Sequence, residues 1–305
     1  MLKKILKITA AVLAAGMLGG CSGNTAQSGS DNGQSAPVNS SPSESSVGGT
    51  SSESSESTDS SSANPESSSS DISSEPEQSE ASEPTVTPIN AEPDYEWDKV
   101  IALTFDDGPN TETTNEVLDV LEKHQVVASF FLIGNNIDDE SAKSVKRAYD
   151  LGCEINNHSK SHGYMDKMTA EEIKAEYDYV DQKVLEITGG HTKFFRPPYI
   201  AVGEEMWENI DVPFISGIGC NDWDDKVTAE MRVKVIERNV KDGCIILMHD
   251  AQGNHMTVEA IDELIPKLKE QGYKFTTVSG LFEAKGIEPT TRMIYSNVTQ
   301  QEMWG

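Results

Sequence analysis

Two histidines and two adjacent aspartates give the chain its clearest chemical pattern. His158 and His162 stand four positions apart, so both imidazoles would share one face if this stretch formed a helical turn. Two histidines and one carboxylate are a common ligand set for a catalytic zinc-like ion, with open positions left for water and substrate. Asp107, which follows Asp106 after an apolar run, would supply the carboxylate. Each pair alone is a weak signal, because a capped turn or a structural histidine pair gives the same spacing.

Strands and helices must bring these side chains together. The sequence predicts such elements, because short β-rich runs alternate with longer helical runs. Residues 100–105 predict a buried strand, and the residues from Thr169 onward predict a capped helix with apolar side chains at helical spacing. The repeated β-then-α order predicts an α/β fold, with a parallel sheet covered by helices and either open or closed into a barrel. We expect strands near 100–105, 126–133, 153–155, 193–195, 214–218, 244–248 and 274–278, and helices near 113–124, 141–150, 169–187, 228–240 and 257–270.

Ionisable residues follow five of the expected strands. In a parallel α/β architecture, catalytic side chains gather at the carboxyl ends of the strands. Any one of these residues could serve the structure alone, but together they predict a site. The residues expected at this edge are Asp106, Asp107, His158, Arg196, Asp222 and His249.

Charge and composition divide the chain of 305 residues into unlike parts. Its 24 Lys and Arg stand against 51 Asp and Glu, a net charge of −27, which argues against nucleic acid as a partner because a binder must neutralise phosphates. Residues 22–96 contain 14 acidic side chains and no Lys or Arg, and they are rich in serine. Such a segment has too little apolar surface to fold, so we expect a disordered linker there. Residues 97–285 are expected to form one folded domain, and 286–305 a C-terminal extension that either packs on the domain or extends from it.

The first 21 residues predict an exported protein. Three lysines precede an apolar run over residues 8–18 that is short for a membrane span, as is typical of a secretory signal. The sequence LGGC, which ends at Cys21, also resembles the lipobox of bacterial lipoproteins, in which the cysteine is lipidated and becomes the N-terminus. On this interpretation Cys21 anchors the protein to the outer face of the membrane, exposed toward the cell wall. The alternative is an ordinary signal peptide that ends near a cysteine.

Three further cysteines, Cys153, Cys220 and Cys244, lie in apolar, strand-like contexts. An odd number leaves at least one thiol unpaired in an exported domain, and we expect them to be buried as small hydrophobic residues. No CxxC spacing occurs, which argues against a zinc site built from cysteines.

Five motifs occur in order across the domain. They are 104–108 (TFDDG), 158–162 (HSKSH), 195–199 (FRPPY), 221–223 (NDW) and 246–250 (ILMHD). With these motifs the sequence resembles the polysaccharide deacetylases of the NodB-homology family, carbohydrate esterase family four, over about residues 98–284. The resemblance implies a single distorted (β/α) barrel with parallel strands. It also implies a hydrolase with one divalent metal ion, zinc in the first place and cobalt, manganese or nickel as alternatives.

The resemblance assigns roles to the residues that match the motifs. Asp107, His158 and His162 would be the metal ligands. Asp106 would be the general base, and Arg196 would pair with it and keep it ionised. A metal makes this division plausible, because it activates water, polarises a carbonyl and keeps the ligand carboxylate deprotonated.

The same resemblance assigns the acid and the substrate pocket. His249 would be the general acid, tuned by Asp222, and Tyr199 would offer its backbone N–H to the oxyanion. The other residues of the implied pocket are Pro197, Trp223 and Leu247.

The substrate stays open at this point. The first prediction is a monomeric de-N-acetylase of GlcNAc polymers such as peptidoglycan or chitin, which the expected anchor beneath a cell wall favours. An acetylxylan esterase is favoured by the short motif before Trp223 and by Ile200 in place of glycine, since both resemble the family branch with bacterial acetylxylan esterases. An inactive carbohydrate-binding lipoprotein is the alternative of another class, and the complete set of base, ligands and acid argues against it. The chain lacks an HExxH motif, which argues against a metalloprotease.

Overall fold

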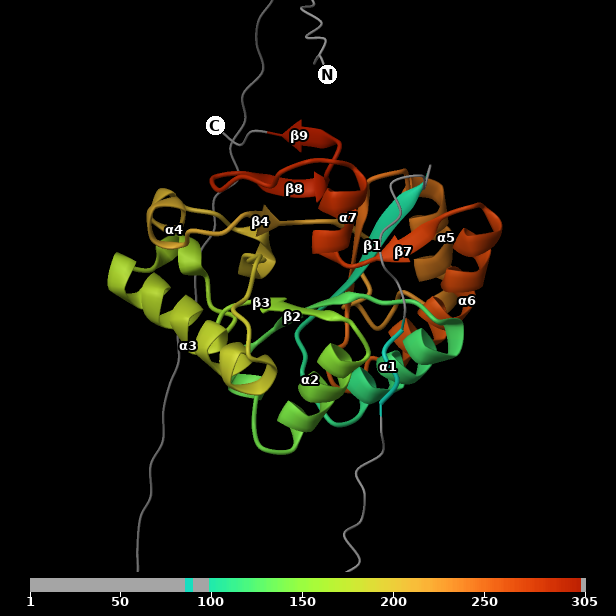
Figure 1. The fold of residues 1–305 in the computed structure, drawn as a ribbon, viewed down its shortest axis with the longest axis horizontal. Coiled ribbons are helices and arrows are strands. Elements are labelled where there is room, and N and C mark those ends of the chain that lie inside the picture. The colour runs from blue at the N-terminus through green and yellow to red at the C-terminus, as the bar shows by residue number, and fades with distance from the viewer. Residues whose placement is uncertain (1–85, 90–98, 303–305) are drawn as a thin grey trace, which may run out of the picture. The chain divides into compact units, whose positions relative to one another are not determined.

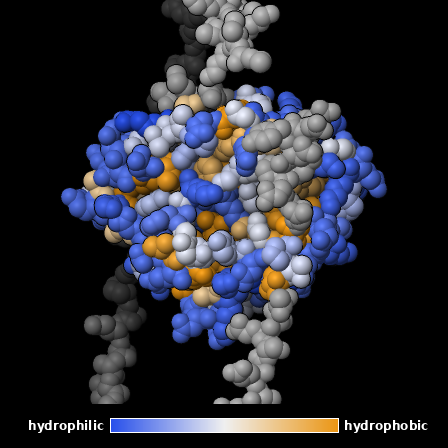
Figure 2. Space-filling model, viewed as in Figure 1, coloured by the Kyte–Doolittle hydropathy of each residue, from blue (hydrophilic) through white to orange (hydrophobic). Residues whose placement is uncertain are grey.

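A computed structural model describes residues 86–89 and 99–302 of the chain. The predicted signal, the lipidation site at Cys21 and the linker up to residue 85 therefore lie outside the described residues. Ile89 is buried, and its backbone N–H donates to the carbonyl of Leu151 (2.9 Å). Among the described helices, none is long and apolar enough to cross a membrane. Hydrophilic residues predominate on the face seen in Figure 2, where hydrophobic residues form small separate patches.

Short strands, most of them paired in parallel, form the interior of the domain (Figure 1). In chain order they are β1 (Val100–Asp106), β2 (Ser129–Leu132), β3 (Glu154–Asn157), β4 (Phe214–Ile215), β5 (Ile218–Gly219), β6 (Ile245–His249), β7 (Lys274–Thr276), β8 (Ile294–Asn297) and β9 (Gln300–Glu302). The main sheet has the order β3-β2-β1-β6-β5, and β7 pairs with the first half of β1. Because these pairings are all parallel, the carboxyl ends of the strands lie at one edge.

The sheet closes into an irregular barrel through a single residue, Phe195. It bridges in parallel to Asn157 at the end of β3 and to Phe214 in β4. Strand β5 follows β4 after two residues and pairs with β6. The ring β1-β2-β3-Phe195-β4/β5-β6 is therefore continuous, and the predicted α/β fold with parallel strands is confirmed.

Helices cover the outside of this barrel (Figure 1). They are α1 (Thr113–His124), α2 (Ser141–Asp150), α3 (Ala170–Thr188), α4 (Glu204–Asn209), α5 (Ala229–Asn239), α6 (His255–Glu270) and α7 (Val278–Ala284), with single 3-10 turns η1 (Gly134–Asn136), η2 (Met165–Lys167) and η3 (Pro198–Ile200). Helix α3 begins as its sequence predicts. The Thr169 side chain accepts the N–H of Glu172, whose carboxylate accepts the N–H of Thr169.

Alternate side chains of β1 point to opposite faces of the strand, and this alternation decides which of them lie inside the barrel. Ile101, Leu103 and Phe105 pack in the larger hydrophobic cluster, together with residues of α1 and α6. Val100 and Ala102 point to the other face and belong to a second cluster inside the barrel. Thr104 and Asp106 continue this inner face and are also buried. The strand thus delivers the Asp106 carboxylate into the barrel mouth.

The segment after α7 packs on the barrel. Strand β8 pairs in parallel with β4, and Tyr295 and Val298 are fully buried in the inner cluster. The Tyr295 ring meets the Phe282 ring edge to face, with centroids 4.9 Å apart. The C-terminal extension is expected either to pack on the domain or to extend from it, and its described residues, up to 302, pack on the domain.

The three cysteines of the domain, Cys153, Cys220 and Cys244, are buried and unpaired. Burial raises the pKa of the Cys153 thiol to about 12 and that of Cys220 also to about 12. These thiols are therefore protonated and unreactive at neutral pH, as expected for small core residues.

Candidate metal and acid-base site

Ionisable side chains from several strand ends converge on one pocket of about 520 Å³. Asp106 ends β1, His158 follows β3 and His249 ends β6, so the parallel edge brings distant parts of the sequence together. Arg196 and Asp222 are buried beside the pocket and contact its members. The pocket is lined by Asp106, Asp107, His158, His162, Pro197, Tyr199, Ile200, Trp223, Leu247 and His249.

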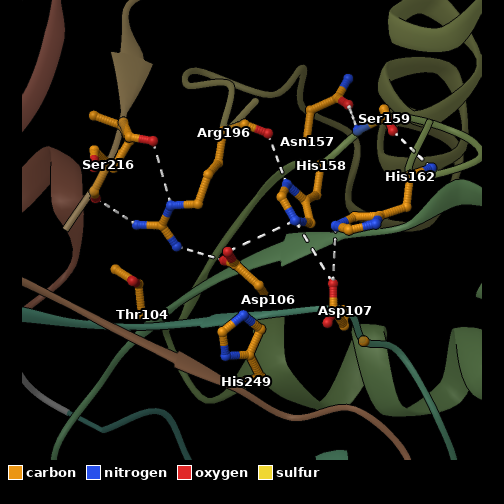
Figure 3. A network of polar contacts seen from close by, with 12 residues as sticks. Thr104, Asp106, Asp107, Asn157, His158, Ser159, His162, Arg196, Ser216 and His249 are labelled. Carbon is orange, nitrogen blue, oxygen red and sulfur yellow. Dashed lines mark hydrogen bonds and ion pairs between the residues drawn. The ribbon is translucent and has the colours of Figure 1, made fainter. Parts of the chain in front are cut away.

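Asp107, His158 and His162 form a group that fits a divalent cation (Figure 3). The Nε2 atoms of His158 and His162 lie 3.6 and 3.5 Å from Oδ1 of Asp107, and the ligand atoms of the group all lie within 4.8 Å of one another. Within the described part of the chain, Oδ1 of Asp107 is buried without a hydrogen-bond partner. A buried carboxylate oxygen without a partner is costly, and a cation between the three side chains would satisfy it.

The loop between the two histidines is not helical, so the helical turn considered for their spacing is wrong. Ser159 and His162 adopt left-handed backbone angles, with φ of 67° and 57°. Oδ1 of Asn157 accepts the N–H of Ser159 (2.9 Å), and the Ser159 hydroxyl accepts the N–H of His162 (2.9 Å). These side-chain hydrogen bonds replace helical ones and fold the loop so that the two rings come within 4.8 Å.

Hydrogen bonding and burial prepare the two imidazoles as ligands. Nδ1 of His158 donates to the carbonyl of Arg196 (2.6 Å), which leaves its Nε2 lone pair directed at the site. Burial lowers the pKa of His162. A lowered pKa keeps this ring neutral, which is the form that binds metals.

Asp106 and Arg196 form a buried ion pair at the base of the pocket (Figure 3). Nη1 of Arg196 donates to Oδ1 of Asp106, while its Nε and Nη2 donate to the carbonyls of Ile215 (3.3 Å) and Ser216 (2.9 Å). The guanidinium also lies 4.0 Å above the centre of the Phe131 ring. Arg196 is 0% exposed, and these contacts fix one face of Asp106 while Oδ2 faces the metal ligands.

His249 and Asp222 form a second polar pair on the other side of the pocket. Nδ1 of His249 lies 2.8 Å from Oδ1 of Asp222, and the backbone N–H of His249 donates to Oδ2 (2.7 Å). Burial lowers the pKa of His249, but the hydrogen bond and charge of Asp222, with Asp106 and Asp107, raise it overall to about 9. The ring is therefore cationic at neutral pH and can donate a proton through Nε2.

Behind this pair stand three residues that the sequence did not single out. The Thr257 hydroxyl donates to Oδ2 of Asp222 (2.8 Å) and accepts from Nη1 of Arg232 (2.7 Å). Nη1 of Arg232 also donates to Oδ1 of Asn254 (2.7 Å), whose amide donates to the carbonyls of Asp222 and His249. Arg232 is 0% exposed, so a buried cation stabilises the Asp222 carboxylate through Thr257. No motif marks these residues, because Arg232 and Thr257 are isolated positions in α5 and α6 and Asn254 is the residue before α6.

Asp250 is a further buried carboxyl that fixes the turn after β1. It accepts the N–H of Gly108 (3.1 Å) and the hydroxyl of Thr114 (2.5 Å), and its own N–H donates to the carbonyl of Asp106. A Cβ atom on Gly108 would lie 2.4 Å from Oδ2 of Asp250, so the close approach requires glycine. Burial raises the pKa of Asp250 to about 7. The turn that carries Asp107 (φ 74°) is thus held against the end of β6.

Exposed aromatic side chains flank the pocket. Tyr199 is 55% exposed and stacks on Tyr164 with ring centroids 4.2 Å apart, and it also meets His162 edge to face at 4.6 Å. Trp223, 67% exposed, lines the same pocket. The Tyr199 backbone is left-handed (φ 59°) within η3. These rings offer flat apolar faces at the entrance to a polar site.

Comparison with protein families and curated proteins places the site among carbohydrate-active enzymes. The family model for polysaccharide deacetylase matches residues 95–211. A bifunctional xylanase/deacetylase of Pseudobutyrivibrio xylanivorans is 49% identical over 201 residues, covering 66% of this chain and 33% of that protein. The peptidoglycan-N-acetylglucosamine deacetylase PgdA of Listeria monocytogenes is 34% identical over 194 residues, covering 63% of this chain and 41% of that protein. The chain therefore spans well under half the length of these two relatives.

Two solved structures have the same fold as the domain and are similar to it in sequence. The Xyl-CE4 domain of a multidomain xylanase from the hindgut metagenome of Trinervitermes trinervoides is 46% identical, with a TM-score of 0.65, covering 66% of this chain and 98% of that one. A family 4 acetyl xylan esterase from Clostridium thermocellum, in complex with a cobalt ion, is 38% identical with a TM-score of 0.65, covering 66% of this chain and all of that one.

Proposed function

Because the chain belongs to the polysaccharide deacetylase family, we propose that its pocket hydrolyses acetyl esters on xylan outside the cell. The observation that carries this proposal is the convergence of a cation-binding triad, a buried ion-paired carboxylate and a cationic histidine on one open pocket. These are the three parts that acyl hydrolysis requires: activation of water, a base for its proton and an acid for the leaving group.

The chain's own residues divide the proton transfers. A divalent cation held by Asp107, His158 and His162 would supply Lewis-acid activation of water and of the acetyl carbonyl. Asp106, held in place by Arg196, accepts a proton from the attacking water. The Tyr199 backbone N–H donates to the oxyanion that develops on the acetyl oxygen.

His249 completes the reaction as the acid. Its protonated ring, held by Asp222 through Nδ1, gives the Nε2 proton to the sugar oxygen as the C–O bond of the ester breaks. The products are acetic acid and the free hydroxyl of the sugar. Pro197, Trp223 and Leu247 line the pocket in which the acetyl group is held.

The preference for an O-acetylated xylan rests on two observations. A bifunctional xylanase/deacetylase and a xylanase's Xyl-CE4 domain are 49% and 46% identical to this chain. In addition, the stretch Asn221-Asp222-Trp223 has the short form that resembles the acetylxylan esterase branch.

N-deacetylation of GlcNAc polymers such as peptidoglycan is the second candidate. It is favoured by the raised pKa of His249, because an amine leaving group depends strongly on protonation by an acid that stays cationic at neutral pH. The 34% identity to PgdA points the same way.

One assay compares the two candidates. Acetate release is measured with the full chain on acetylxylan, chitooligosaccharides and peptidoglycan, with and without a chelator, followed by readdition of zinc or cobalt. We expect release from acetylxylan at least about tenfold above that from the N-acetyl substrates, a discrimination of about 1.4 kcal/mol. Faster release from peptidoglycan would favour the second candidate, and no release from any substrate would refute both.

The location belongs to the proposal as well. Residues 1–21 support export, and the LGGC sequence supports a lipid anchor at Cys21 on the outer face of the membrane. Cell fractionation tests this directly: Cys21→Ala should release the protein from the membrane fraction, while Cys153→Ala should not. Retention of the Cys21 variant in the membrane would exclude the anchor.

A further inference from the structure

We propose that a second pocket, of about 330 Å³ beside Asp107, is a subsite for a neighbouring sugar unit of the polymer. This inference rests on the proposed function of the metal pocket. The second pocket lies where the loops after β1, β2 and β6 meet, and Asp107 lines both pockets. Its size is in the range of small-molecule sites, and its lining is polar.

Part of the pocket is already fixed by hydrogen bonds within the chain. The side-chain Oδ1 of Asn110 accepts the backbone N–H groups of Glu112 (3.1 Å) and Thr114 (3.2 Å), and its side-chain amide donates to the backbone carbonyl of Asp250 (2.7 Å). The amide of Asn136 donates to the carbonyl of Asp107 (2.8 Å). These side chains give the pocket a rigid wall, and a ligand would not need to displace them.

Other side chains of the pocket have polar atoms that are available to bind a ligand. Asn135 and Gln252 are exposed, and their side chains form no hydrogen bond with any described residue. Oδ1 of Asp138 accepts the backbone N–H groups of Glu140 and Ser141, which leaves Oδ2 for a ligand. Two amides and a carboxylate oxygen together offer both donors and acceptors.

This chemistry selects a neutral, hydroxyl-rich ligand. Sugar hydroxyl groups donate and accept at once, so each matches an amide or a carboxylate oxygen. None of the described residues that line the pocket is Lys or Arg, and the Asp138 carboxylate places negative charge there, which disfavours phosphate and carboxylate groups. The pKa of Asp138 is lowered by the hydrogen bonds from Ser141, so its carboxylate stays ionised.

Because Asp107 lines both pockets, one polymer chain could occupy both at once. A polymer that lies across both would place one sugar unit against the free amides and the adjacent acetylated unit at the metal ligands. Binding of the neighbour would then orient the reacting unit. A small acetyl ester fills the metal pocket alone and gains nothing from the second pocket.

The double variant Asn135→Ala/Gln252→Ala tests the subsite. For wild type and variant, kcat/KM is measured on 4-nitrophenyl acetate and on acetylated xylohexaose. We expect the ratio of the hexaose value to the small-ester value to fall about tenfold, about 1.4 kcal/mol, through KM rather than kcat. Gln182→Ala, which removes an exposed amide on α3, is the matched control and should leave the ratio unchanged.

The outcomes separate the subsite from the function. An unchanged ratio in the double variant, with an active wild type on the hexaose, overturns the subsite alone. If the wild type deacetylates chitohexaose instead, the same ratio is measured on that substrate, and an unchanged ratio again overturns the subsite. If neither hexaose is deacetylated, the proposed function fails, and NMR titration with deacetylated xylohexaose and chitohexaose decides. Equal affinity in wild type and double variant would then overturn the subsite.

Discussion

The two sides of the pocket are built in opposite ways. On the metal side, Asp107, Ser159 and His162 hold left-handed backbone angles, and a buried oxygen of Asp107 has no hydrogen-bond partner among the described residues. On the acid side, Oδ2 of Asp222 accepts the His249 backbone N–H and the Thr257 hydroxyl, while Oδ1 contacts the His249 ring. A cation would complete the contacts on the metal side, whereas both oxygens of the Asp222 carboxylate on the acid side already have partners within the chain.

The two sides therefore differ in how their side chains are held in position for the reaction. The proposed metal ligands are placed by loop geometry, and a divalent cation would complete their contacts. The acid is placed by a network that ties strand ends to α5 and α6, so its charge is set by the folded chain. Changes on the metal side should therefore alter cation binding and abolish the reaction, whereas changes on the acid side should alter the pH dependence while the cation stays bound.

Removal of a metal ligand should give the largest effect. For His158→Ala we expect loss of cation binding and a fall in acetate release of at least about 10³-fold, because a metal supplies several kcal/mol of transition-state stabilisation. Added zinc should raise the Tm of the wild type, since a ligand that binds only the folded state stabilises it, and should not raise that of the variant. His191→Ala, an exposed histidine paired with Asp181, is the control. A zinc-dependent rise in the Tm of His158→Ala would show that the cation binds elsewhere.

Loss of the proposed base should come next. Asp106→Asn keeps the shape of the side chain but cannot accept the proton, so we expect a fall of about 10²- to 10⁴-fold in kcat with zinc still bound. The buried Arg196 loses its counter-ion, which should reduce the free energy of unfolding by about 3 kcal/mol. Calorimetry with zinc and denaturant unfolding measure the two effects. Wild-type turnover with an unchanged zinc affinity would rule out Asp106 as the base.

The sequence predicts the strand ends of the site better than the loops that follow them. Apolar runs mark β1 and β6 clearly, so the pattern of the chain is enough to place Asp106 and His249 at a common edge. The spacing of His158 and His162 identifies them as a pair, but the loop that joins their rings depends on hydrogen bonds from Asn157 and Ser159, which spacing does not encode.

Long-range packing explains what the sequence could not predict. The expected strand over 214–218 is divided into β4 and β5, and the carbonyls of Ile215 and Ser216 at the interruption accept hydrogen bonds from Arg196. Thr257 and Arg232 meet only because α5 packs against α6. Neither residue has a local pattern that distinguishes it from an ordinary helix position, so their role follows from tertiary contacts alone.

A smaller effect is expected when the partner of the acid is changed. In Asp222→Asn the charge that raises the pKa of His249 is gone while burial still lowers it, so that pKa should fall from about 9. The high-pH limb of kcat/KM should move down by about three units, so activity at pH 7.5 should fall by about 30-fold. Zinc affinity should stay the same, unlike in His158→Ala. Asp225→Asn, an exposed neighbour, serves as the control, and an unmoved limb in Asp222→Asn would refute the assignment of His249 as the acid.

The smallest effect is expected at Thr257, and its sign is opposite. Thr257→Val keeps the shape but removes the hydroxyl that donates to Asp222 and so lowers the pKa of that carboxyl. Asp222 then becomes a stronger acceptor for His249, and the high-pH limb should move up by a few tenths of a unit, with a loss of about two- to fivefold in kcat/KM. The unfolding free energy should drop by about 1–3 kcal/mol, since Arg232 loses one acceptor but keeps Asn254. Thr257→Ser retains the hydroxyl and should restore the wild-type limb. A downward shift in Thr257→Val, as in Asp222→Asn, would mean that Thr257 acts on the acid by a route other than the carboxylate.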